Sequence, residues 1–92
     1  MFVSEISDLE STIGKHVRVT REFADVPTGS TGRIVEFYNI GKNHPGITVE
    51  WDNIPLAAWT KRNLRDGFGR DPDFDETQWL EVLEDTVAGV EV

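Results

Sequence analysis

Polar and apolar residues alternate in several short stretches of the chain. The stretches at 16–21 (HVRVTR) and 47–52 (ITVEWD) each place apolar side chains on one face and polar side chains on the other. A period of two residues is typical of a half-buried β-strand. A third strand is predicted over 31–38, where Gly32 indicates a bulge or a bend, and a fourth over 56–60. The pattern therefore indicates a fold built mainly from short strands.

Two segments carry helix signals instead. The sequence Ser-Asp-Leu-Glu at 7–10 matches a capping box and predicts a short helical turn near the start of the chain. A longer amphipathic helix is predicted over about 75–88. Asp75 would be its N-cap, and Phe74 and Trp79 would form a hydrophobic staple at its first turn.

Turns at intervals of about ten residues between four short strands favour a small β-barrel. The segments 22–30 and 65–72 are rich in glycine, proline or aspartate and are predicted as loops. We expect a single domain over 1–92, with the barrel at about 14–70 and the C-terminal helix covering an open end or an exposed edge. The expected core contains Val17, Val19, Ile34, Val35, Val49, Trp51, Leu64, Phe68, Trp79 and Leu83.

Several runs in the chain resemble a pattern found in small bacterial SH3-like barrel proteins, many of them uncharacterised. The runs are GKHVRVTR at 14–21, VPTGSTGRIV at 26–35, VEWD at 49–52 and DGF at 66–68. The family pattern reads roughly GKxVRVTRxF, VPxGTxGxV, VEWD and DxF, followed by an acidic terminal helix, and the resemblance covers about 14–85. It implies an SH3-like fold but no particular activity, because ligand sites differ among such barrels. Related barrels bind RNA or protein in translation factors, and others are accessory subunits of larger complexes.

The chain departs from the SH3 domains of eukaryotic signalling. It lacks their A-L-Y-D-Y start, their pair of adjacent tryptophans and their P-x-x-Y end. A groove for polyproline peptides is therefore not expected.

The charge of the chain is uneven. It carries 17 acidic and 9 basic residues, a formal net charge of −8. The centre, 14–65, is mildly basic, whereas 66–92 contain one basic residue, Arg70, and nine acidic ones. The acidic end could be a solvated surface, a docking face for a basic partner, or a segment that screens the basic centre.

Candidate catalytic and metal-binding residues are few. The chain has no cysteine, which excludes disulfides, a thiol nucleophile and thiolate metal sites. His16 and His44 show no recognisable base–nucleophile spacing. The run DPDFDE at 71–76 begins like a calcium loop, but it lacks the glycine at position six, and Val82 stands at position twelve. We therefore expect no catalytic activity, no metal and no cofactor.

Location and partner class follow from the same composition. No apolar run approaches the roughly 18 residues of a membrane span, and the first residues lack the basic segment and apolar run of a signal peptide. A cytoplasmic protein without a membrane partner is expected, and it is expected to be a monomer. Direct nucleic-acid binding is disfavoured, because a net charge of −8 repels a polyanion.

The function predicted from the sequence is that of an adaptor or accessory module that binds another protein. One alternative is an acidic regulator that occupies the basic groove of a nucleic-acid-binding protein. Another is an RNA- or DNA-binding barrel that uses the basic centre. The predicted contacts combine loop residues at the rim of the barrel with the acidic face of the helix: Phe23, Asp25, Tyr38, Trp59, Glu76, Glu81, Glu84 and Asp85.

Overall fold

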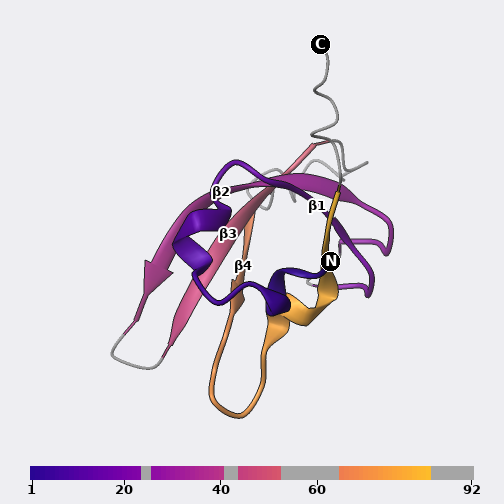
Figure 1. Ribbon diagram of the computed structural model, residues 1–92. Helices are drawn as coiled ribbons and strands as arrows, with labels where there is room; N and C mark the ends of the chain where they lie inside the picture. Colours follow the sequence, from indigo (N-terminus) through magenta and orange to yellow (C-terminus); the bar gives the residue numbers. More distant parts are fainter. Residues whose placement is uncertain (24–25, 41–43, 53–64, 84–92) are drawn as a thin grey trace.

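The alternating stretches form an antiparallel sheet in the computed structural model, which describes residues 1–23, 26–40, 44–52 and 65–83. Among these residues the strand order is β4-β3-β2-β1-β5 (Figure 1). The strands are β1 (His16–Val19), β2 (Thr31–Asn39), β3 (Pro45–Trp51), β4 (Arg65–Gly69) and β5 (Leu80–Val82). The prediction of a mainly β fold is confirmed, and three of the four predicted strands correspond to β1, β2 and β3. The fourth predicted strand, 56–60, lies outside the described residues.

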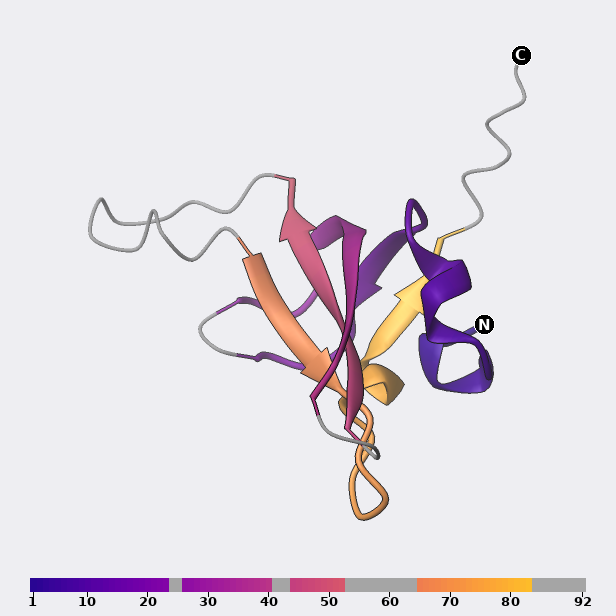
Figure 2. The ribbon, with the colours of Figure 1, turned by 90° about the vertical axis from the view of Figure 1, so that its left-hand side faces the viewer.

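The sheet is open, so the closed barrel predicted from the sequence is not present in the part of the chain that the structure describes. Its two edges are β4 and β5. The outer edge of β5 is covered by the start of the chain, because the Val82 amide donates to the Met1 carbonyl at 2.7 Å and Phe2 bridges to Glu81. Figure 2 shows the N-terminal turns beside this strand.

One strand lies where the sequence predicted a loop. Residues 65–69 (RDGFG) pair along β3, with Phe68 opposite Ile47 and Gly69 opposite Gly46. Phe68 is fully buried, and this burial outweighs the weak strand propensity of the two glycines beside it. The loop prediction for 65–72 is therefore wrong over its first five residues.

The predicted C-terminal helix over about 75–88 is also wrong over the residues described there. A single 3-10 turn, η4 (Glu76–Trp79), is followed at once by β5. Asp75 does cap the turn, since its carboxylate accepts from the Thr77 amide at 2.9 Å. The chain then becomes extended because Leu80–Val82 pair with β1, and this pairing outweighs the local helical pattern. Residues 84–88 lie outside the described residues.

The predicted N-terminal turn is present as a 3-10 turn, η2 (Leu9–Thr12), preceded by a second turn, η1 (Val3–Glu5). The cap of η2 is Asp8 rather than Ser7, because the Asp8 carboxylate accepts from the Glu10 amide at 3.2 Å. Both turns contribute to the core, which the sequence pattern did not indicate.

The core lies on one face of the sheet and under these turns. Six residues expected there are buried: Val17, Val19, Ile34, Val49, Trp51 and Phe68. Val35, Trp79 and Leu83 are half-buried rather than fully enclosed. The core also contains residues that the sequence analysis missed: Val3, Leu9, Val26, Ile47 and Leu80. Leu64 is outside the described residues.

Gly32 is required by a close approach rather than by a bulge. A Cβ atom at this position would lie 2.6 Å from the backbone oxygen of Glu50 on β3. The register irregularity of β2 falls between Ile34 and Glu36 instead. The glycine therefore allows β2 and β3 to pack closely under the core.

Candidate functional site

The segment 70–79 contacts the connection between β1 and β2 and the connection between β2 and β3. The backbone oxygen of Trp79 accepts from the amide and the hydroxyl of Thr20, at 2.8 and 3.0 Å, where β1 leads into the β1–β2 connection. His44 Nδ1 lies 2.8 Å from Asp71 Oδ1, which links the β2–β3 connection to the same segment. The segment 70–79 therefore runs between two connections that lie at opposite ends of β2, with Trp79 at one of them and Asp71 at the other.

Four aromatic side chains contact one another in a continuous row that ends in the segment 70–79, here called the aromatic cluster: Phe23, Phe68, Phe74 and Trp79. Phe23 stacks on Phe68 with 4.4 Å between ring centroids. Trp79 lies 5.4 Å from Phe23 on one side and 5.4 Å from Phe74 on the other. Phe68 is fully buried, whereas Phe74 is 46% exposed. The aromatic cluster thus extends from the core to the surface.

A cation lies over Trp79, between the two ends of the cluster. The guanidinium carbon of Arg21 lies 4.8 Å from the centroid of the Trp79 ring, within the range of a cation–π interaction. Among the residues that the structure describes, Arg21 forms no ion pair with a carboxylate. The aromatic face of Trp79 is therefore its main contact.

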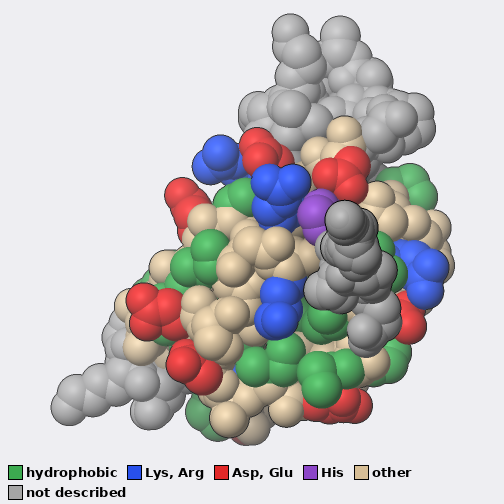
Figure 3. Space-filling model, turned by 45° about the horizontal axis from the view of Figure 1, so that its top comes forward, with side chains coloured by type: hydrophobic (Ala, Val, Ile, Leu, Met, Phe, Trp, Pro, Cys, Tyr) green, Lys and Arg blue, Asp and Glu red, His purple; other side chains and the backbone are tan. Residues whose placement is uncertain are grey.

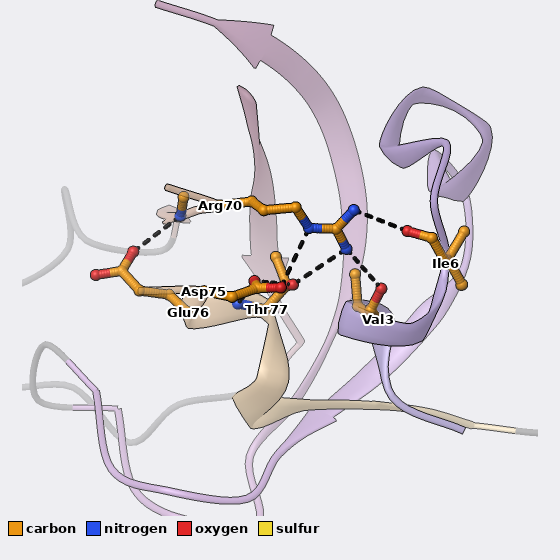
Figure 4. Close-up of polar contacts among 7 residues, drawn as sticks. Val3, Ile6, Arg70, Asp75, Glu76 and Thr77 are labelled. Carbon is orange, nitrogen blue, oxygen red and sulfur yellow. Dashed lines mark hydrogen bonds and ion pairs between the residues drawn. The ribbon is translucent and has the colours of Figure 1, made fainter. Parts of the chain in front are cut away.

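Contacts of Arg70 with Val3, Ile6 and Asp75, here called the clasp, hold the segment 70–79 against the N-terminal turn η1 (Figure 4). The two terminal nitrogens of Arg70 donate to the backbone oxygens of Ile6 at 2.9 Å and Val3 at 3.0 Å. Arg70 Nε lies 3.2 Å from Asp75 Oδ2, and the same Asp75 carboxylate accepts from the Thr77 hydroxyl. These contacts hold η1 and η4 together and so set the position of the Trp79 ring, which ends η4.

Tyr38 lies near the segment 70–79, and its ring lies against glycines of β3 and β4. Gly46 on β3 is the register partner of Tyr38, and Gly69 on β4 is the partner of Gly46. A Cβ atom at Gly46 would overlap the Cζ and Oη atoms of the Tyr38 ring, and one at Gly67 would lie 3.1 Å from Oη. The absence of side chains at these positions is what lets the ring lie across β3 and β4.

The environment of the ring changes its acidity. Burial raises the pKa of Tyr38 above its usual value of 10.0, and the charges of Glu76 and Asp71 raise the pKa further. Both effects disfavour the phenolate, because one removes water and the other brings negative charge near a developing anion.

Titration of Tyr38 tests this environment directly, because the chain has one tyrosine. The ultraviolet absorbance of the phenolate should give a midpoint above 10.0 for the folded protein, and a midpoint near 10 in urea. A folded-state pKa above the unfolded one contributes stability below pH 10.0 that is lost as the pH rises through the folded-state pKa. Glu76→Gln should lower the folded midpoint, and equal midpoints for folded wild type and unfolded chain would contradict this account.

The predicted acidic face does not form within 75–83. Glu76 accepts from the Gly69 amide at 2.8 Å, which satisfies a backbone donor on the edge strand β4. Glu81 lies in β5 opposite Arg18 and pairs with it at 2.6 Å. The exposed carboxylates of this region belong instead to Asp71 and Asp73, on either side of the turn that leads to Phe74.

The structure describes four of the eight predicted site residues. Phe23 belongs to the aromatic cluster, Glu76 lies near Tyr38, and Glu81 pairs with Arg18 in the β1–β5 pair. Asp25, Trp59, Glu84 and Asp85 lie outside the described residues.

Three residues of this surface were missed as contacts by the sequence analysis. Phe74 and Trp79 had a usable signal, because the predicted hydrophobic staple between them is present as a ring contact. No signal in the sequence indicated Arg21, because its position over Trp79 depends on the pairing of β1 with β5.

Charges on the rest of the surface are mixed. Arg65 lies 3.5 Å from Glu50 and 3.8 Å from Glu36, and Arg18 is paired with Glu81. Figure 3 shows basic and acidic side chains interspersed with hydrophobic ones on one face of the molecule. The basic residues of these strands are thus partly neutralised by acidic neighbours.

No group of three or more histidine, aspartate or glutamate side chains that could hold a metal ion occurs among residues 1–23, 26–40, 44–52 and 65–83. In the described part of the chain, no helix has the length and apolar character needed to cross a membrane.

The surface defined by the aromatic cluster, Tyr38 and the acidic segment 71–76 is therefore the strongest candidate for a functional site. Comparisons of the chain with protein-family models, with curated proteins and with solved structures find no match.

Proposed function

We propose that the protein is a non-catalytic module that binds another protein through the aromatic cluster and the adjoining acidic segment 71–76. The observation that carries the proposal is Phe74, which is 46% exposed while it packs on Trp79. An exposed ring backed by a rigid stack is typical of the anchor residues at the centre of protein interfaces, because little conformational entropy is lost when it is buried. The acidic residues around it would contribute the polar rim.

We also propose that the sheet is a variant of the SH3-like barrel that the sequence motifs resemble. In support, five antiparallel strands follow one another around a single core, and η4 contacts both edge strands, β4 and β5. In such an arrangement the 3-10 turn bridges the gap between the two edges.

The two other functions predicted from the sequence have less support. Direct nucleic-acid binding would need a continuous basic surface, whereas Arg18 and Arg65 have acidic partners. A nucleic-acid mimic was predicted from an acidic helix face, and within 75–83 the chain forms a 3-10 turn and a strand instead.

Replacement of Phe74 by alanine should abolish partner capture. The experiment is an affinity pull-down from host lysate, with and without nuclease treatment, in which wild type, Phe74→Ala and Ile13→Ala are compared at equal loading. Ile13 is a matched control, because it is also hydrophobic and 47% exposed but belongs to the η2 end of the chain. We expect Phe74→Ala to reduce a specific partner at least about tenfold, with no loss for Ile13→Ala. Equal capture by all three proteins, or a signal that nuclease removes, would overturn the proposal.

A further inference from the structure

The guanidinium of Arg21 shows what kind of group the face of Trp79 accepts. It lies 4.8 Å from the ring centroid, and the neighbouring rings of Phe23 and Phe74 hold the indole in place at 5.4 Å each. Arg21 is exposed, and no carboxylate among the described residues fixes it in this position. Its attachment to the surface is therefore weak, since an exposed cation–π contact contributes little.

Exposed acidic residues next to members of the cluster in the sequence favour a second cation over an anion. Asp71 and Asp73 are exposed beside Phe74, and Glu22 follows Arg21 in the chain and is also exposed. The Asp71 carboxylate already contacts His44, whereas Asp73 has no basic partner within the described residues. These carboxylates would attract a basic side chain that approaches the cluster from outside, whereas Arg21 forms no ion pair with any of the three.

We propose that the aromatic cluster takes an arginine side chain from a basic segment of the partner protein, and that this arginine displaces Arg21 from Trp79. The inference rests on the protein-binding function proposed above and names the chemistry of the partner. Arginine is favoured over lysine because a planar guanidinium stacks on an aromatic face and is less strongly hydrated than an ammonium group. Arg21 then acts as an internal competitor that lowers the apparent affinity for the partner.

The competition predicts a gain of affinity on removal of a residue. Arg21→Ala should bind an arginine probe about two- to fivefold more tightly than wild type, which corresponds to the usual strength of an exposed cation–π contact. Lys15→Ala is the matched control. It removes one exposed positive charge, so it changes the net charge equally, but it leaves Arg21 on the ring. Tightening by Arg21→Ala alone would separate displacement from general electrostatic attraction.

The probe is a five-residue peptide of glycine and serine around one arginine, and its control carries neutral citrulline at the same place. Binding is followed on the full chain by the NMR signal of the Trp79 indole N–H, one of three tryptophans, assigned with Trp79→Phe. We expect the arginine peptide to shift this signal saturably and the citrulline peptide to leave it unchanged. No shift with the arginine peptide, equal shifts with both peptides, or equal tightening by Lys15→Ala and Arg21→Ala would overturn the inference.

The inference and the proposed function fail separately. If partner capture depends on Phe74 but the arginine peptide does not bind at Trp79, the protein-binding function stands and the partner chemistry is wrong. If capture does not depend on Phe74, the protein-binding function itself is wrong, whatever the peptide does.

Discussion

Replacement of Arg70 by alanine is expected to lower the free energy of unfolding by about 2–4 kcal/mol. The substitution removes the donors to the Val3 and Ile6 backbone oxygens and the cation beside Asp75. The side chain is only 21% exposed, so water would replace these contacts poorly. Both η1 and η4 should loosen, because Arg70 contacts both of them. Urea unfolding followed by tryptophan fluorescence measures the loss.

Arg65→Ala provides the matched control for this prediction. Arg65 is the first residue of the edge strand β4 and also contacts carboxylates, but its side chain is 52% exposed. Removal of an exposed ion pair costs at most about 1 kcal/mol. If Arg70→Ala and Arg65→Ala had equal midpoints, the clasp would not stabilise the fold.

Gly46→Ala is expected to cost about 2–3 kcal/mol, because the new methyl group would overlap the Tyr38 ring. The cost should nearly vanish in a background that carries Tyr38→Ala, where the space is free. The coupling energy of this double-mutant cycle should therefore be about 2 kcal/mol. The cycle isolates the contact from the intrinsic effect of alanine in a strand.

Gly69→Ala is the control within the same cross-strand row. A Cβ atom at Gly69 would lie 3.8 Å from Tyr38 Oη, which is an ordinary van der Waals contact. This substitution should leave the free energy of unfolding within about 0.5 kcal/mol of wild type. Additive effects of Gly46→Ala and Tyr38→Ala on the free energy of unfolding would show that the Tyr38 ring does not lie against Gly46.

The strands with an alternating pattern could be predicted from the sequence, and β4 could not. The period of two in β1 and β3 is set by a sheet that is buried on one face, and that information is local. In β4 the glycines at 67 and 69 suggested a loop, whereas they lie beneath Tyr38, a residue of β2. The reason for these glycines is a contact across two strands, which no local pattern contains.

The C-terminal segment illustrates a conflict between local and tertiary preferences. The apolar residues Trp79, Val82 and Leu83 fit a helical period, and the cap at Asp75 is real. The extended conformation nevertheless prevails after one turn, because β1 would otherwise expose a row of backbone donors and acceptors at the edge of the sheet.

The candidate site was predictable where it depends on sequence neighbours. The contact between Phe74 and Trp79 follows from their spacing around the cap at Asp75. The order of the strands brings Tyr38 near the charge of Glu76, and it places Arg21 over Trp79. These contacts required the structure.

Amide hydrogen exchange on the captured complex shows directly whether a partner protein binds at the aromatic cluster and the segment 70–79. We expect slowed exchange in peptides that contain 20–23 and 70–79, with little change around the register pair Arg33 and Glu50 of β2 and β3. Protection confined to the residues around Arg33 and Glu50, with exchange at 70–79 unaltered, would contradict binding at this surface.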